Sequence, residues 1–270
     1  MKPVMKTGVV FIDGIAYGIT AVSVSEQRTE MDASDTSSGG NYVGQSGMLK
    51  YAFSFRMFAK TESPTFITGA DYQIHIAMEA FAYLGTGRFS GISKSGEIDG
   101  AYALDVSGNY YGVVNAYGHE LNVLNPYFQL WTGASTVADN YSQAYTTPSK
   151  QTDAQGRYYQ RIISSAGQDG NFTMTPASSL LDKEKYVIGD TMTHIVLARQ
   201  TATAPIQSFL HINNTDKAIQ NLTSEWVLYG ADKTITHADG VNQMRWRITS
   251  AGGGGFQQDI AYWSLRQKIT

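Results

Sequence analysis

Three observations predict a mainly β fold for this chain of 270 residues. Glycine and tyrosine are abundant, with 27 and 17 copies, and together they favour strands and turns over helices. The dipeptide Asp13-Gly14 is a hairpin-turn signal between an apolar run, Val9 to Ile12, and a loosely alternating one, Ile15 to Val24. From Leu49 to Ala59, apolar residues recur with period two, which predicts a half-buried strand. Its apolar face holds Tyr51, Phe53, Phe55 and Met57.

Further strands are expected wherever apolar and β-branched residues alternate or cluster between turn signals. Their ranges are 72–78, 101–106, 158–164, 191–197, 207–212, 226–229, 244–248 and 260–265. The segment 74–84 also admits a helical turn, and short helical segments are expected at 180–186 and 217–222. The segment 85–112 is dense in turn residues, with Gly96 and Asp99-Gly100 expected to bracket short segments, and the polar segment 132–156 is predicted to be a long loop or an insertion.

The apolar pattern stops from Ser25 to Gly47, directly before the most regular strand. Charge in this segment comes from Glu26, Arg28, Glu30, Asp32 and Asp35, and flexibility from Ser37 to Gly40. The sequence therefore predicts a loop of roughly twenty residues, a length that is usually functional or disordered in compact domains.

Composition excludes several classes of protein. Charged residues make up only 16% of the chain, against about 25% in typical soluble domains, which suggests a surface partly covered by neighbours. The net charge of −3 and the lack of a basic block argue against a face that grips nucleic acid. Without cysteine there is no disulfide, thiolate ligand or cysteine nucleophile. No signal peptide or apolar run of about 20 residues is recognised, so we expect a protein made in a cytoplasm without membrane insertion.

The sequence contains no complete catalytic, metal-binding or cofactor-binding motif, so we expect neither an enzyme nor a bound cofactor. The five histidines lack ligand spacing, and the acidic segment around Asp32 lacks the spacing of a calcium loop. The nucleophile-elbow pattern fails at Met48, and the glycines from Gly85 to Gly91 miss the dinucleotide fingerprint by one residue. Glu97 and Asp99, the candidate carboxylate pair, lie in a predicted turn.

The order of segments in the first 118 residues resembles the major tail tube proteins of long-tailed bacteriophages and the related inner tubes of contractile injection systems. The segments that carry this resemblance are "IDG", "EMDASDTSSGG", "MLKYAFSFRMFAK", "FITGADYQIHI" and "GTGRFSGISKSGEIDGAYALDVSGNYYG". The resemblance implies a tail-tube-like β-barrel or sandwich with a flanking short helix in residues 1–118. Residues 119–270 would be a β-rich continuation, insertion or second domain.

The resemblance also implies a structural virion protein of the tail, assembled in the host cytoplasm. Homohexameric rings would self-assemble into a stack around a conduit for DNA ejection, so that DNA passes only transiently. Its partners would be other copies of itself, a tape measure protein, and tail terminator and baseplate proteins. The barrel-wall strand would hold Tyr51, Phe53, Phe55 and Met57. The inter-ring assembly loop would comprise Asp32, Asp35, Thr36, Ser37, Ser38, Gly39 and Gly40.

An alternative interpretation is a carbohydrate- or receptor-binding β module of a virion or cell surface. It would use exposed aromatic residues, with Tyr127 to Trp131 and Tyr158-Tyr159 as the candidate segments. Aromatic residues more often fill a β core or a subunit interface. A hydrolase on a β scaffold is a third hypothesis.

Overall fold

The structure is a computed structural model that describes residues 8–32, 44–59, 66–98, 101–120, 125–153, 155–165, 167–174, 189–201, 208–212, 215–219, 222–234, 244–248 and 255–269. Every regular element in these ranges is a β-strand, which confirms the prediction of a mainly β protein. No helix in the described ranges is long and apolar enough to cross a membrane. The expected helix at 180–186 lies outside them. The expected helical turn at 217–222 is wrong, because residues 217–219 pair within a β-hairpin.

The chain divides into two compact units, each treated separately below. The barrel unit comprises Met1–Ile12, Tyr17–Ala77 and Tyr83–Asn115, and the sandwich unit comprises Asp13–Ala16, Met78–Ala82 and Ala116–Thr270. Two short segments of the N-terminal region thus group with the C-terminal region, which a single sequence boundary after residue 118 does not capture.

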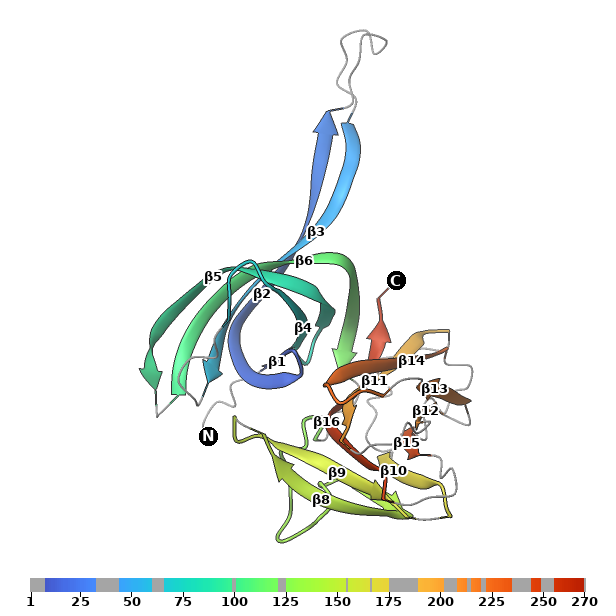
Figure 1. The fold of residues 1–270 in the computed structure, drawn as a ribbon. Coiled ribbons are helices and arrows are strands. Elements are labelled where there is room, and N and C mark those ends of the chain that lie inside the picture. The colour runs from blue at the N-terminus through green and yellow to red at the C-terminus, as the bar shows by residue number, and fades with distance from the viewer. Residues whose placement is uncertain are drawn as a thin grey trace, which may run out of the picture. The chain divides into compact units, whose positions relative to one another are not determined.

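Six antiparallel strands form the closed β-barrel (Figure 1). In chain order they are β1 (Gly8–Ile12), β2 (Ile15–Asp32), β3 (Gly44–Ala59), β4 (Asp71–Ala77), β5 (Ala82–Ile98) and β6 (Ala101–Glu120). Their order around the barrel is β6-β3-β2-β1-β4-β5, and pairing of β5 with β6 closes it. Closure satisfies both edges of the sheet, which would otherwise be open to other chains.

Strand β3 contributes its apolar side chains to the barrel interior. Phe53, Phe55 and Met57 are at most 3% exposed, whereas the intervening Ser54 is exposed. The ring of Phe53 packs against Tyr110 of β6 at a centroid distance of 4.9 Å. A close approach here requires glycine at position 108, where a Cβ atom would lie 2.5 Å from the Phe53 ring.

The glycine-rich segment 85–112 forms most of β5 and β6, so the turn expected at Gly96 is wrong and the strand expected at 101–106 is confirmed, whereas Asp99-Gly100 lies outside the described residues. A Cβ atom at position 87 would lie 2.8 Å from Ile74, and one at position 108 would meet the Phe53 ring. These glycines therefore make room inside the barrel. Turn chemistry and close packing both select glycine, and the sequence alone does not separate the two uses.

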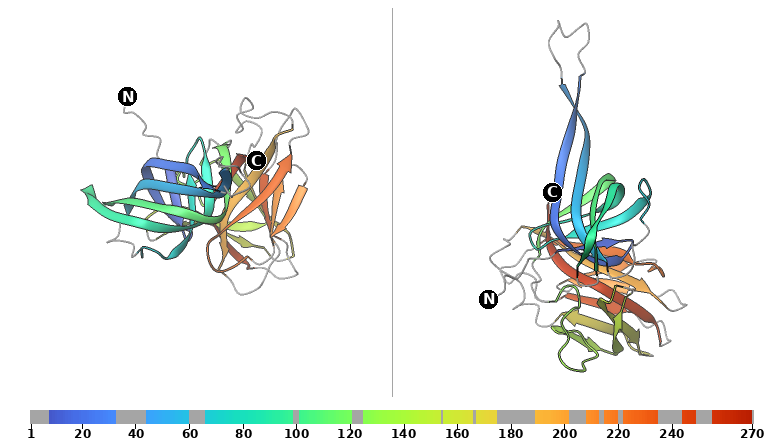
Figure 2. Two further views of the ribbon diagram at one scale, coloured as in Figure 1. Left: turned by 90° about the horizontal axis from the view of Figure 1, so that it is seen from above. Right: turned by 90° about the vertical axis from the view of Figure 1, so that its left-hand side faces the viewer.

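Strands β2 and β3 continue beyond the barrel as a two-stranded arm, which we define as Gln27–Asp32 paired with Gly44–Lys50 (Figures 1 and 2). The pairing reaches Asp32 opposite Gly44. The prediction of a loop from Ser25 to Gly47 is therefore wrong at both ends. Ser25 and Glu26 are both exposed, so this part of β2 has no buried face and shows no apolar alternation. Strand formation there depends on backbone pairing, which the apolar pattern does not report.

The sandwich unit contains the remaining strands. They are β7 (Tyr141–Ala144), β8 (Thr146–Thr152), β9 (Tyr158–Ser164), β10 (Gly170–Met174), β11 (Thr191–Gln200), β12 (Ser208–Ile212), β13 (Thr215–Ile219), β14 (Val227–Thr234), β15 (Met244–Ile248) and β16 (Gln257–Lys268). One group of strands pairs as β14-β11-β16-β9-β8, and the other sheet has the order β13-β12-β15-β10-β7. Strands β7 and β8 lie in the segment 132–156, which we predicted to be a long loop or an insertion.

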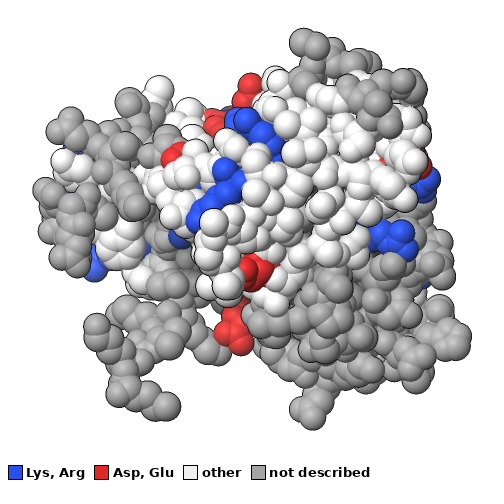
Figure 3. Space-filling model, turned by 90° about the horizontal axis from the view of Figure 1, so that it is seen from below, with Lys and Arg blue, Asp and Glu red and all other residues white. Residues whose placement is uncertain are grey.

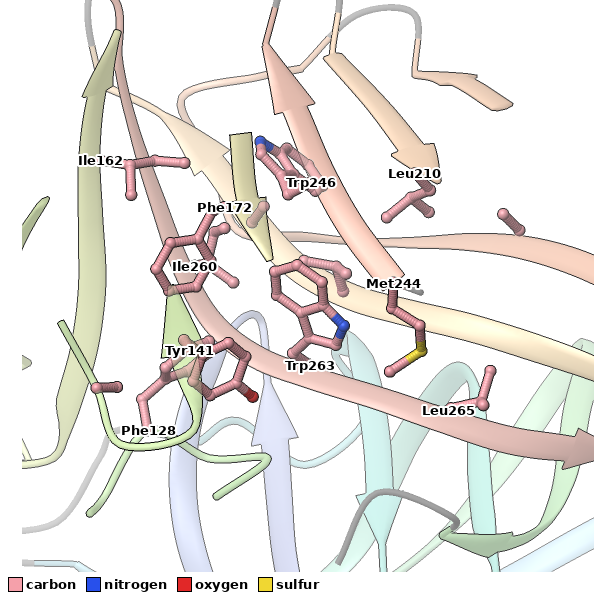
Figure 4. Close-up of a cluster of buried hydrophobic side chains, with 14 of the residues drawn as sticks. Phe128, Tyr141, Ile162, Phe172, Leu210, Met244, Trp246, Ile260, Trp263 and Leu265 are labelled. Carbon is pink, nitrogen blue, oxygen red and sulfur yellow. The ribbon is translucent and has the colours of Figure 1, made fainter. Parts of the chain in front are cut away.

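A cluster of buried hydrophobic side chains forms a core among the described strands of the sandwich unit (Figure 4). Trp246 of β15 and Trp263 of β16 are both completely buried. Phe172 of β10 packs against Tyr141 of β7 with stacked rings 5.2 Å apart and against Trp263 at 5.7 Å. The core therefore joins side chains from both sheets, as in a β-sandwich.

Candidate functional site

Of the predicted assembly-loop residues, the structure describes Asp32 alone. Asp32 is the last residue of β2 and pairs with Gly44 through the backbone. The other predicted loop residues, Asp35, Thr36, Ser37, Ser38, Gly39 and Gly40, lie outside the described residues. The predicted barrel-wall residues lie on β3, where three are buried and Tyr51 is partly exposed.

The arm offers backbone hydrogen-bonding groups to a partner. Strand β3 pairs with β6 from Tyr51 to Ala59, and no pairing of Gly44–Lys50 with a third strand is present in the described part of the chain. The only strand partner described for Gln27–Asp32 is likewise β3. A two-stranded ribbon leaves every second N–H and C=O on both outer edges available for strand addition.

Two of the aromatic residues that the sequence analysis selected meet around one lysine in the sandwich unit. The ammonium of Lys150 lies 3.5 Å from the ring centroid of Tyr158 and 5.2 Å from that of Trp131. Tyr158 is 37% exposed, and the other two are partly exposed. We call these three residues the aromatic clip. Sequence reasoning did not identify Lys150, which comes from the neighbouring strand β8.

A rigid loop positions the clip. The amide nitrogen of Asn125 donates to the carbonyl oxygens of Leu130 and Asp139, and its Oδ1 accepts from the Leu130 N–H. The Gln129 side chain donates to the carbonyl oxygen of Tyr158 at 3.0 Å, which ties the loop to β9. The two rings are therefore held on ordered backbone, as a binding platform requires.

Tyr159 points away from Tyr158, as the pleat of β9 requires. On its face of the sheet, Arg161, Asp259 and Arg199 lie side by side on β9, β16 and β11. Arg161 donates to both oxygens of Asp259 at 2.7 and 3.0 Å, and Arg199 donates to Oδ2 at 3.0 Å. We call this arrangement the Arg–Asp–Arg ladder. The hydrogen bond to Asp259 raises the pKa of Arg161.

A second charged cluster is fully enclosed. Arg266 lies 2.8 Å from Glu120 and donates to the hydroxyl oxygen of Tyr262 at 3.2 Å and to the carbonyl oxygen of Gly118 at 3.0 Å. Ser264 donates to the other oxygen of Glu120. Burial raises the pKa of Tyr262 far above its ordinary value. Because every group is enclosed and paired, this cluster is a structural element and not a binding site.

On the face shown in Figure 3, most described atoms belong to uncharged residues, and lysines and arginines form separate groups instead of one stripe. No group of three metal-ligating side chains is present in the described ranges.

No protein-family model and no curated protein matches this chain. Among solved structures, an arabinose-bound α-L-arabinofuranosidase is 17% identical with a TM-score of 0.41, covering 55% of this chain and 26% of that one. Tailspike protein 4 of bacteriophage CBA120 is 14% identical (TM-score 0.37, 54% and 21% coverage). The xylan-binding domain from Paenibacillus barcinonensis is 9% identical (TM-score 0.35, 53% and 92%). This chain thus spans about a quarter of the first structures it resembles. Such low scores carry no conclusion about function.

Proposed function

We propose that this protein is a structural subunit that associates with copies of itself through the β2–β3 arm. The observation that carries the proposal is the ribbon from Gln27–Asp32 to Gly44–Lys50, which continues past the barrel without a third described strand. An isolated two-stranded hairpin is at best marginally stable in water. A partner surface that accepts a strand or covers the ribbon would stabilise it.

The barrel itself supports association through the arm. Its closed sheet leaves no edge among the six barrel strands, so the arm is where the barrel unit offers backbone pairing. A contact between the arm of one copy and a different surface of the next is head-to-tail and builds rings or open stacks. A hexameric tail tube that conducts DNA is the finer form of this proposal, and it rests on the sequence resemblance.

The experiment that tests this proposal shortens the arm without changing the barrel. In the variant, residues 28–49 are replaced by Asn-Gly, which closes a two-residue hairpin after the Gln27–Lys50 pair. We expect the short-arm variant to be a folded monomer. We expect the unmodified protein to form rings or tubes, which negative-stain microscopy and sedimentation would detect. A matched variant that lacks only residues 34–43, which connect β2 and β3 in the sequence, tests whether the paired strands or these connecting residues make the contact. Unchanged assembly of the short-arm variant, or a strictly monomeric unmodified protein, would contradict the proposal.

A second candidate function, carbohydrate binding by the sandwich unit, is favoured by the aromatic clip. Partly exposed aromatic rings on a fixed loop are a recurrent platform for the apolar face of a sugar, with polar side chains beside them. Trp131 and Tyr158 supply the rings, and Lys150 supplies donors for sugar hydroxyls.

Titration of neutral oligosaccharides with detection by calorimetry tests this second function. We expect Trp131→Ala and Tyr158→Ala each to weaken binding by about tenfold, the effect of losing one stacking contact. Tyr145→Ala is the control, because Tyr145 is 56% exposed and lies outside the clip. Equal losses in all three variants, or no binding by the unmodified protein, would exclude the clip as a sugar site.

A further inference from the structure

The Arg–Asp–Arg ladder holds more positive than negative charge. Asp259 is completely buried, whereas the side chains of Arg161 and Arg199 are 22% and 27% exposed. Among the described residues, Asp259 is the only carboxylate within ion-pair distance of either arginine. One guanidinium charge therefore remains unbalanced on a mostly covered surface, where charges are normally paired.

The two arginines keep donors available for a ligand. Arg161 uses Nε and Nη2 for Asp259. Arg199 directs Nε and Nη2 at Asp259, each 3.0 Å from Oδ2, and its Nη2 also lies 3.4 Å from the hydroxyl oxygen of Tyr159. The Nη1 group of each arginine has no hydrogen-bond partner in the described part of the chain. Asp259 holds both planar groups in place, so less rotamer entropy is lost when a ligand binds.

Two aromatic side chains flank the ladder. The guanidinium carbon of Arg199 lies 4.5 Å from the ring centroid of Trp226 and 5.8 Å from that of Tyr159. The two rings meet edge to face, with their centroids 5.5 Å apart and their planes at 87°. Trp226 is partly exposed. A planar cation beside aromatic surface matches a ligand that has both a carboxylate and an apolar ring face.

From this geometry we infer that the ladder binds a carboxylate-bearing sugar, such as a uronic acid residue of an acidic polysaccharide. A planar carboxylate accepts two N–H bonds from guanidinium groups and neutralises the single excess charge. A polyanion such as duplex DNA would need a row of positive charges, whereas the ladder has two arginines and one carboxylate. The inference rests on the proposed carbohydrate-binding function in one respect, namely that the ligand group carrying the carboxylate is a sugar ring.

The ladder and the aromatic clip lie on opposite faces of β9, because Tyr158 and Tyr159 are consecutive residues of one strand. The two sites therefore do not share side chains. A long acidic chain would contact them independently, and each site can be removed by mutation without changing the other.

The test compares the methyl glycoside of galacturonic acid with the methyl glycoside of galactose, which differ only at C6, where a carboxylate replaces a hydroxymethyl group. Binding is followed by NMR through the side-chain Nε–H signals of the arginines and the indole N–H signal of Trp226. We expect galacturonate to shift the signals of Arg161, Arg199 and Trp226, and galactose to leave the arginine signals unchanged. Added salt should weaken binding of the acidic sugar more than binding of the neutral sugar.

Substitutions of single arginines test which side chains bind the acidic sugar. Arg199→Gln should weaken galacturonate binding by at least about tenfold, since it removes a charged hydrogen bond. Arg199→Lys keeps the charge but loses the planar fork, so binding should fall while folding is retained. Arg247→Gln is the matched control, because Arg247 pairs with Asp169 elsewhere and is 35% exposed.

The outcomes separate this inference from the proposed functions. Three results would overturn the acidic-sugar site. They are equal affinity for the two sugars, no binding of the galacturonate glycoside, or a loss of affinity in Arg247→Gln equal to that in Arg199→Gln. If oligosaccharides bind at the clip but the galacturonate glycoside does not bind at the ladder, the proposed carbohydrate-binding function is supported and the acidic-sugar site is overturned. If galacturonate binds with the expected arginine dependence while the clip variants change nothing, the ladder site stands alone.

Discussion

Arg266 and Glu120 form an ion pair of 2.8 Å between opposite residues of β16 and β6, and both side chains are buried within the sandwich unit. Arg266 also donates to the carbonyl oxygen of Met78 at 2.8 Å. One guanidinium therefore joins three segments of the chain that are far apart in sequence. Such a pair contributes little net stability when intact, but loss of one partner leaves an uncompensated buried charge.

We therefore expect Glu120→Gln to lower the free energy of unfolding by about 3–5 kcal/mol. The amide cannot neutralise Arg266, which is completely buried. Denaturant titration measures the change. Asp105→Asn is the control, because its ion pair with Arg56 is exposed and its removal should matter far less. Similar losses in the two variants would show that burial does not set the effect.

Gly14 lies in the hairpin turn between β1 and β2 with a φ of +80°, and a Cβ atom there would lie 1.9 Å from Cβ of Trp226. Gly14→Ala should therefore destabilise the protein through both backbone strain and a steric clash. The strain contributes roughly 1–2 kcal/mol and overpacking about 1–3 kcal/mol more. Gly69→Ala is the matched control, since φ is +87° but the space is open. If thermal melting shows equal shifts for both variants, the contact with Trp226 has no energetic effect.

Phe53→Asp and Phe55→Asp should each prevent folding of the barrel unit. Both side chains are at most 3% exposed, and a buried unpaired carboxylate costs at least about 4 kcal/mol. Ser54→Asp, between them on the exposed face of β3, should change stability by less than about 0.5 kcal/mol. Circular dichroism and melting curves distinguish the three variants. A cooperative, unshifted melt of either phenylalanine variant would refute this assignment of the strand's faces.

Stability should fall in alkaline solution. Burial raises the pKa of five tyrosines above the ordinary value of 10.0, namely Tyr110, Tyr117, Tyr127, Tyr229 and Tyr262. Above pH 10 the unfolded chain releases these protons while the folded chain keeps them. The folded state then binds more protons, so the free energy of unfolding decreases as pH rises, and it is unaffected by these groups below that range.

Denaturant titration at several pH values, together with tyrosinate absorbance of the folded protein, checks this dependence. Tyr110→Phe removes one phenol from the barrel interior and should reduce the alkaline loss. An unfolding free energy that stays constant through alkaline pH, or tyrosines that ionise at their ordinary pKa in the folded state, would contradict the prediction.

Much of the fold follows from local pattern. The strand predictions at 158–164 and 244–248 agree residue for residue with β9 and β15, because each alternates across a half-buried sheet. The turn at Asp13-Gly14 is also confirmed, with both residues at positive φ as a two-residue hairpin of this kind requires. The arm is not predicted from the apolar pattern, because its strands are defined by backbone pairing, which that pattern does not report.

The candidate sites were only partly predictable. The sequence predicts exposed aromatic side chains at Trp131 and Tyr158-Tyr159. Trp131 and Tyr158 are at least partly exposed, whereas Tyr159 is buried, so that part of the prediction is wrong. The ladder could not be found by spacing, because its ion pairs join residues 98 and 60 positions apart. Arginine and aspartate are scattered along the chain, and no local signal distinguishes these three.

The sequence by itself determined that the protein is mainly β, lacks cysteine chemistry and contains a strand whose apolar face includes Phe53 and Phe55. These properties depend on composition and on the period-two geometry of a single strand. The tertiary structure alone decided how β5 and β6 close the barrel, how far the arm extends, and which side chains meet at Asp259. These properties depend on pairing between distant strands, whose register is set by contacts that no local stretch of sequence contains.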